Sequence, residues 1–251
     1  MAKDPMHQFH IDRIVPLEVA GLDASFSNAS LFMVLAAGAA AALMLYGVRN
    51  RALVPNRLQL VVEGAYSFVH DMLYNATGSD GVKKFFPLVF SLFIFIFMAN
   101  MIGMVPGTFT PTSHIVVTAL MALLVFGTVI VVGFMKNGLD FLKLFAPAGV
   151  PAPLYVIVTP IEIISFFSRP LSHAVRLWAN IFAGHVLLKV FAGFVPMMAA
   201  AGGIGLLGSI LPLGMTVALF ALEFLVAFLQ AYVFAMLTCI YLNDALHAGH
   251  H

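Results

Sequence analysis

Six polar side chains recur at helical spacing in the apolar stretch from Pro160 to Phe191 of a chain with only 9% charged residues. At about 100° per residue, they fall within roughly 40° of Arg176 and form one stripe along a helix. Ionisable groups are costly in hydrocarbon, so at membrane depth they usually face protein, water or an ion path. This polar stripe comprises Glu162, Ser165, Arg169, Ser172, Arg176 and Asn180.

Arg176 is the residue whose environment matters most, because its guanidinium group keeps its proton at any physiological pH. It is a fixed positive charge that needs a negative partner in a low dielectric. Glu162 lies about four turns away on the same helix, too far to pair directly, and Glu223 can pair only if the last helix turns it inward. The simplest partner is a carboxylate on another subunit. A basic side chain that snorkels to the interface is the alternative, and it suits Arg169 or Lys189 better than Arg176.

His185 and Glu223 are the candidates for proton exchange, since suitable burial shifts the pKa of either side chain toward neutral pH. His185 follows Arg176 by nine residues and therefore points about 180° away from it. On adjacent helices the two could form a relay; the alternative is a packing histidine beside a buried neutral glutamate.

Several polar residues do not titrate but can orient water or a carboxylate. Asn180 and Gln230 are of this kind, and Gln230 shares a helix face with Glu223 seven residues earlier. Asn100 can bond a neighbouring helix. The secondary candidates are Arg169, Ser172, His173 and Asn100.

The composition indicates an all-α polytopic membrane protein. Hydrophobic residues make up 62% of the 251 residues, against about 45–50% in soluble domains, and they form blocks of about 20 residues. The single cysteine excludes an intrachain disulfide and a cysteine metal cluster. No metal spacing, cofactor motif or basic nucleic-acid-binding tract is present, and the first residues do not resemble a cleaved signal peptide.

The pattern predicts a single membrane domain over residues 1–251, with about five membrane helices and one interfacial amphipathic helix. We expect the amphipathic helix at 57–77 to lie in the interface; a soluble helix packed on the span ends is the alternative. The predicted segments are an outside arm at 1–28, spans at 30–48, 85–105 and 115–135, a long helix at 154–195 carrying Arg176, and a last helix at 205–243.

The apolar sequence from Leu154 to Pro196 is too long for one upright crossing. As a helix it would reach ~60 Å, against a hydrocarbon core of ~30 Å. The helix therefore breaks at Pro160 or Pro170, or it is strongly tilted, and the sequence leaves both open.

Positive charges set the predicted orientation. They gather between the first two spans and again after the third, which marks those sides as cytoplasmic or matrix. The loop after the second span, GTFTPTSHI, has no charged residue. The amino terminus is therefore expected outside and the carboxyl terminus inside. The basic residues are Arg49, Arg51, Arg57, Lys83, Lys84, Lys136 and Lys143.

The run SRPLSHAVRLWANIFAGH, Ser168 to His185, resembles the signature of subunit a of the membrane sector of F-type rotary ATP synthases. That pattern has Arg/Lys-Pro, a Ser, an Arg-Leu, an Asn and an Ala-Gly-His/Glu. Further matches are PNxxQxxxE from Pro55, the FxxNxxGxxP run ending at Pro106, FTPTS from Phe109 and LQAYVFAMLTCIYL from Leu229. The resemblance covers nearly the whole chain, and the arrangement of His185 and Glu223 looks more like the mitochondrial and alphaproteobacterial branch.

The resemblance implies that Arg176 is the essential arginine, facing a carboxylate of the rotating c-ring. Asn180 and Gln230 would flank it, His185 and Glu223 would line an outside aqueous half-channel, and Glu162 would lie near the inside one. The last two helices would form a long tilted hairpin against the ring. Arg176 would separate the channels and prevent a leak, so that proton flow drives ring rotation and ATP synthesis.

The resemblance also implies a non-catalytic subunit without cofactor or active site. Its partners would be the c-ring, peripheral-stalk b-type subunits and the rest of the complex, in the bacterial inner membrane or, as the alternative, the mitochondrial one. A second class of function is a stand-alone secondary transporter or channel with a buried Arg/Glu substrate site. An intramembrane enzyme is disfavoured because no nucleophile pair or HExxH metal set is present.

Overall fold

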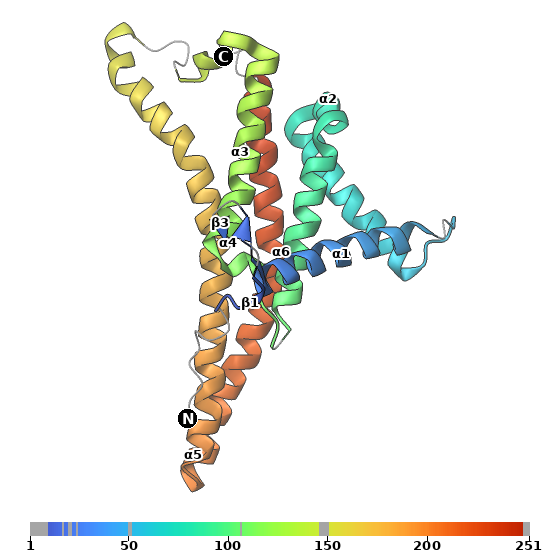
Figure 1. Ribbon diagram of the computed structural model, residues 1–251, viewed down its shortest axis with the longest axis vertical. Helices are drawn as coiled ribbons and strands as arrows, with labels where there is room; N and C mark the ends of the chain where they lie inside the picture. The colour runs from blue at the N-terminus through green and yellow to red at the C-terminus, as the bar shows by residue number, and fades with distance from the viewer. Residues whose placement is uncertain are drawn as a thin grey trace. The chain divides into compact units, whose positions relative to one another are not determined.

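The computed structural model describes residues 10–16, 18–19, 22–23, 25–49, 52–105, 107–145 and 151–247. Five helices in this part of the chain are long and apolar enough to cross a membrane, which confirms the predicted all-α polytopic class. They are α1 (Asn28–Arg49), α2 (Arg57–Gly103), α3 (Ile115–Asn137), α4 (Tyr155–Ala199) and α6 (Ile210–His247) (Figure 1).

Short elements connect these helices. Before α1, β1 (Arg13–Val15) pairs antiparallel with β4 (Phe26–Ser27), and β2 (Glu18–Val19) pairs with β3 (Leu22–Asp23). The 3-10 turns are η2 (Pro111–Ser113), η3 (Gly138–Phe145) and η4 (Ala152–Leu154), and α5 (Gly203–Gly208) precedes α6. Residues 1–9 of the predicted arm, Arg51 of the basic loop and the predicted helix stop at Pro106 lie outside the described residues.

The chain divides into two compact units, each assembled from three segments. Unit 1 comprises Met1–Ala42, Ile94–His114 and Leu177–Ala231. Unit 2 comprises Leu43–Phe93, Ile115–Arg176 and Tyr232–His251.

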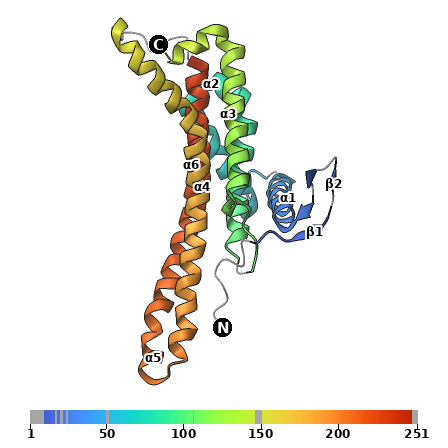
Figure 2. The ribbon, with the colours of Figure 1, turned by 60° about the vertical axis from the view of Figure 1, so that its left-hand side comes forward.

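Unit 1 is built on the stretches of α4 and α6 that α5 joins, which run side by side in Figure 2. Leu177 of α4 and Ala227 of α6 are each 1% exposed, and Ile96 of α2 is fully buried. Ala36, in the alanine-rich middle of α1, is also fully buried, as expected where small residues let helices approach closely.

Unit 2 has an aromatic core between α3, η3 and the first part of α4. The ring of Phe166 lies 5.0 Å from that of Phe126 and 6.2 Å from that of Phe141, centroid to centroid. The Asn137 side-chain amide donates to the Ala245 carbonyl at 2.7 Å and joins the end of α3 to the end of α6. The contacts among the Phe126, Phe141 and Phe166 rings add to the free energy gained by burial alone.

Helix α2 begins with a side-chain cap, since Asn56 Oδ1 accepts the Gln59 backbone N–H at 2.8 Å. The sequence predicts an amphipathic helix at 57–77 and a separate span at 85–105. The two instead follow each other without a loop, and only Gly78, with φ 71° and ψ −171°, departs from helical geometry. Near the start of α2, Gln59 is 6% exposed, and its side-chain amide donates to the Ala52 carbonyl and to Glu63 Oε1.

Helix α4 runs for 45 residues and continues through Pro160 and Pro170. Of the two possibilities left by the sequence, a break at either proline therefore does not occur. A proline inside a helix removes one backbone hydrogen bond, and membrane helices tolerate this where neighbours satisfy the freed carbonyl. The last helix starts at Ile210 after the separate α5 and extends to His247, beyond the predicted end at 243.

Candidate functional site

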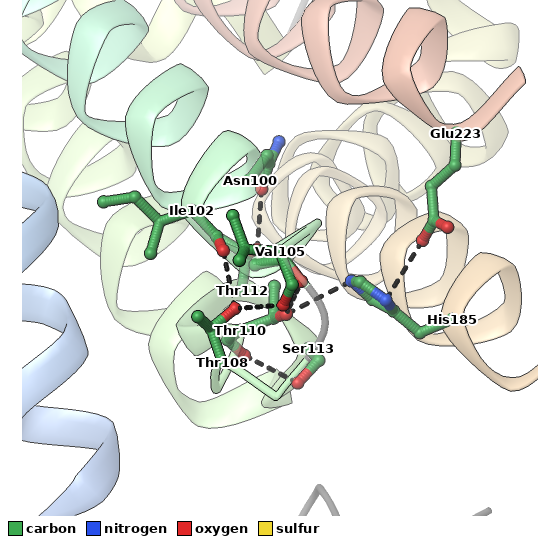
Figure 3. Close-up of polar contacts among 10 residues, drawn as sticks. Asn100, Ile102, Val105, Thr108, Thr110, Thr112, Ser113, His185 and Glu223 are labelled. Carbon is green, nitrogen blue, oxygen red and sulfur yellow. Dashed lines mark hydrogen bonds and ion pairs between the residues drawn. The ribbon is translucent and has the colours of Figure 1, made fainter. Parts of the chain in front are cut away.

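The most buried ionisable pair of unit 1 is His185 on α4 with Glu223 on α6 (Figure 3). Their residues are 8% and 6% exposed, and His185 Nδ1 lies 3.2 Å from Glu223 Oε1. The contact is within ion-pair range but is not an aligned hydrogen bond, and Oε1 has no other hydrogen-bond partner among the described residues. Two adjacent groups of this kind can pass a proton between them.

Gly184 makes room for this pair. A Cβ atom at this position would come within 3.1 Å of Glu223 Oε1 and 3.4 Å of its Cδ. The carboxyl group is therefore held close to the α4 backbone. A side chain at Gly184 would require the Glu223 carboxyl group to shift by a few tenths of an ångström.

A hydroxyl group contacts His185 on its other side. Thr110 Oγ1 lies 3.1 Å from His185 Nε2 and also donates to the Gly103 carbonyl at 3.3 Å. Thr110 is 4% exposed. Both ring nitrogens of His185 thus face polar partners, Glu223 on one side and the loop after α2 on the other (Figure 3).

The described part of that loop, Gly107–His114, is anchored by its hydroxyl groups. Thr112 donates to Asn100 Oδ1 at 2.6 Å, and the Asn100 amide donates to the Ala227 carbonyl of α6 at 3.2 Å. Thr108 donates to the Ile102 carbonyl at 2.6 Å. The predicted role of Asn100 as a bond to a neighbouring helix agrees with this contact. The loop is therefore a fixed support for His185.

Arg176, in unit 2, is exposed and makes no hydrogen bond or ion pair with any other described residue. The same exposure holds for most of the polar stripe: Ser165, Ser172 and Asn180 are exposed, while Glu162 and Arg169 are half-buried. The Ser172 hydroxyl bonds back to carbonyls of its own helix. The described part of the chain thus supplies no carboxylate to Arg176.

Arg169 differs from Arg176 because it is paired within unit 2. Its guanidinium group donates to Asp244 Oδ2 at 2.7 Å, and its Cζ lies 5.4 Å from the centre of the Tyr241 ring. Both charged side chains are partly shielded from solvent. Arg169 therefore joins α4 to the end of α6, and the sequence alone gives no sign of its partner.

The remaining predicted residues have separate environments. His173 is 3% exposed, its ring centre lies 3.8 Å from that of Phe234, and neither ring nitrogen has a hydrogen-bond partner in the described chain. Gln230 is 9% exposed in unit 1. Among the described residues, no three His, Cys, Asp or Glu side chains gather as metal ligands would.

Sequence reasoning missed Thr110, Gly184 and Asp244. Thr110 lies in the quoted FTPTS run, and Gly184 lies in the Ala-Gly-His run, but an uncharged loop and a glycine carry no ionisable signal of their own. Their contacts depend on which helices meet in three dimensions.

Comparison with known proteins gives one family. The sequence profile described as ATP synthase A chain matches residues 30–243. The chain is 60% identical to ATP synthase subunit a of Mesorhizobium japonicum over 98% of each chain. It is 58% identical to the subunit a of Allorhizobium ampelinum and 59% identical to that of Rhizobium meliloti, over the full length of both chains in each case.

Proposed function

This chain belongs to the ATP synthase A chain family, and we propose that it is the proton-translocating stator subunit in the membrane sector of that enzyme. The five long apolar helices of the described residues make it a multi-pass membrane protein. Membership of the complex, rather than solitary transport, is supported by the full-length similarity to subunits named for ATP synthase.

The observation that carries the proposal is the exposed Arg176. A permanent cation on a membrane helix is costly unless an opposite charge meets it, and no described carboxylate of this chain pairs with it. The partner we assign is the carboxylate of a neighbouring rotating ring, the c-ring. Asn180, four residues further along α4 and also exposed, would lie at the same interface.

The proton enters through an aqueous half-channel on the outside. His185 and Glu223 accept and release it, and Gln230 helps to orient the water or the carboxylate at the end of the path. The proton then neutralises a ring carboxylate. Once neutral, that carboxylate can enter lipid, whereas its ionised form cannot because of the desolvation cost.

After nearly a full rotation, the ring site loses its proton to an inside half-channel near Glu162. Arg176 attracts the ionised site between the two channels and blocks direct passage of protons. Each elementary charge that crosses gains ~2.3 kcal/mol per 100 mV of membrane potential. Rotation is one-directional because only the protonated site can move through lipid.

The proposal includes a location and an orientation. The protein lies in a bacterial inner membrane with its amino terminus outside and its carboxyl terminus in the cytoplasm. Arg49 at the end of α1 and Lys136 at the end of α3 support this, because basic residues concentrate on the cytoplasmic side. Peripheral-stalk b-type subunits would hold the subunit against the rotating ring.

Disulfide cross-linking tests the interface. In an otherwise native complex carrying Cys239→Ala, Asn180→Cys should form a disulfide with a cysteine placed next to the ring carboxylate. The matched control is Ala174→Cys on the same helix, because Ala174 is 3% exposed and faces the interior of unit 2. The proposal predicts the product for Asn180→Cys alone; no product, or equal products from both variants, would exclude this face of α4 as the interface.

A further inference from the structure

We propose that Thr110 holds His185 in the tautomer that carries its proton on Nε2. Protons then enter and leave the His185 imidazole only at Nδ1, opposite Glu223. This inference rests on the proposed function, in which His185 and Glu223 form part of the proton path. Thr110 is a positioning residue here, since it acts through His185.

The direction of the Thr110 hydrogen bonds follows from the end of α2. Gly103 is the last residue of that helix, so its carbonyl lacks the N–H that a further turn would supply. The Thr110 hydroxyl donates to it at 3.3 Å. A hydroxyl has one hydrogen to donate, so the 3.1 Å contact with His185 must use a Thr110 lone pair, and Nε2–H is the donor.

The opposite arrangement leaves a buried group unsatisfied. If Thr110 donated to Nε2, the Gly103 carbonyl would lose this hydroxyl partner, and a buried polar group without a partner costs about 1–3 kcal/mol. Thr110 and His185 are 4% and 8% exposed, so both side chains of this contact are buried. In proteins, the hydrogen bond at one ring nitrogen commonly determines the role of the other.

The Nε2–H to Thr110 bond serves both charge states of His185. In the neutral state, Nδ1 is bare and can take up the proton of a protonated Glu223. Transfer breaks the Glu223 O–H bond, forms the Nδ1–H bond and leaves a carboxylate beside an imidazolium. Neither state requires a change at Nε2, so the 3.2 Å Nδ1–Oε1 contact is the only edge where the proton moves.

The surroundings add few other charges to this pair. Glu223 faces the His185 imidazole from α6, and Lys189 lies one turn further along α4. The loop contributes hydroxyl groups and one titratable residue, His114, whose ring stacks on Phe109 at 4.9 Å. Thr110 is therefore the loop residue that sets the state of Nε2.

The functional test compares three variants in the intact complex. Thr110→Val keeps the shape of the side chain and removes the hydroxyl, Thr110→Ser keeps the hydroxyl, and Thr108→Val removes a hydroxyl that bonds only its own loop and the end of α2. We expect Thr110→Val to slow ATP-driven proton pumping about tenfold per assembled complex, the lower end of what loss of an orienting partner costs a metal-bound histidine. Thr110→Ser and Thr108→Val should stay within about twofold of the parent. Equal effects of Thr110→Val and Thr108→Val would overturn the proposal.

The spectroscopic test reads the tautomer directly. Solid-state ¹⁵N NMR of the complex, with histidines labelled in this subunit and the His185 signal identified through His185→Gln, distinguishes protonated from bare ring nitrogens. The parent should show a protonated Nε2 and a bare Nδ1 when His185 is neutral, and Thr110→Val should populate the other tautomer. A bare Nε2 in the parent, or an unchanged tautomer in Thr110→Val, would overturn the inference. This result does not depend on the ring-facing role of Arg176, so the two proposals can fail separately.

Discussion

Two arginines of α4 differ in whether their charge has a partner within the described chain. Arg169 has Asp244 at 2.7 Å and an aromatic ring beside it, so its charge is satisfied where it lies. Arg176, two turns further along α4, forms no ion pair with a carboxylate of the described residues. A substitution of Arg169 should therefore act through the packing of α4 on α6, whereas one of Arg176 should act through a partner outside the chain.

The stability of the loop at residues 107–114 should depend on pH through His114. It precedes α3, and burial lowers its pKa from the ordinary value of 6.5; its Nε2 has no hydrogen-bond partner in the described chain. The folded loop therefore binds this proton less tightly than an unfolded loop, and stability is lost as the pH falls below about 6.5. Hydrogen exchange of residues 107–114, corrected for the intrinsic rate, should be faster at pH 5.5 than at pH 7.5.

His114→Gln is the control, because it cannot titrate. It should remove the pH-dependent part of the exchange, while any part due to His185 or Glu223 would persist. Exchange that is the same at both pH values in the parent would contradict the prediction.

At the residue scale, the sequence predicted the identity of the ionisable groups better than their contacts. Period and spacing showed that His185 and Arg176 point in opposite directions, and one is buried while the other is exposed. The pairing of His185 with Glu223 stayed one of two alternatives. Thr110 could not be found, because its contact with His185 joins residues that are 75 positions apart.

The kink in helix α2 depends on one glycine. Gly78 has φ 71° and ψ −171°, a region that residues with a Cβ atom rarely adopt. Gly78→Ala should destabilise the subunit by about 1–3 kcal/mol. The measurement is the temperature at which the subunit dissociates from the purified complex.

Gly64→Ala is the matched control on the same helix. Gly64 lies in the helical part of α2 and a Cβ there meets no atom within 4 Å, so alanine should leave the temperature unchanged or raise it, by up to about 1 kcal/mol of stability. If Gly78→Ala and Gly64→Ala behave alike, the kink is not needed.

Hydrophobic period and length predicted the five long helices, because apolar stretches of about 20 residues have few other uses. The sequence was less informative about joints. It predicted two separate helices, at 57–77 and 85–105, where α2 has only a kink, and it left the continuity of α4 open. Whether a proline or glycine interrupts a helix depends on neighbours that satisfy the backbone, and those neighbours are not local in sequence.

For the whole molecule, membership of the ATP synthase A chain family supports the proposal that the exposed Arg176 meets its partner on another subunit. A chain that acted alone would need its own carboxylate for Arg176, and the described residues provide none. In the proposed stator, the missing charge belongs to a rotating neighbour, and the buried His185–Glu223 pair supplies that neighbour with protons.

Arg176→Ala in the complete enzyme tests this claim most directly. ATP-driven acidification of inverted membrane vesicles should be lost while the amount of assembled complex stays normal, since Arg176 makes no pair within the described chain. Arg49→Ala, an exposed arginine at the end of α1, is the control and should pump normally. Normal pumping by Arg176→Ala would contradict the account; loss of pumping in Arg176→Ala alone is the predicted result.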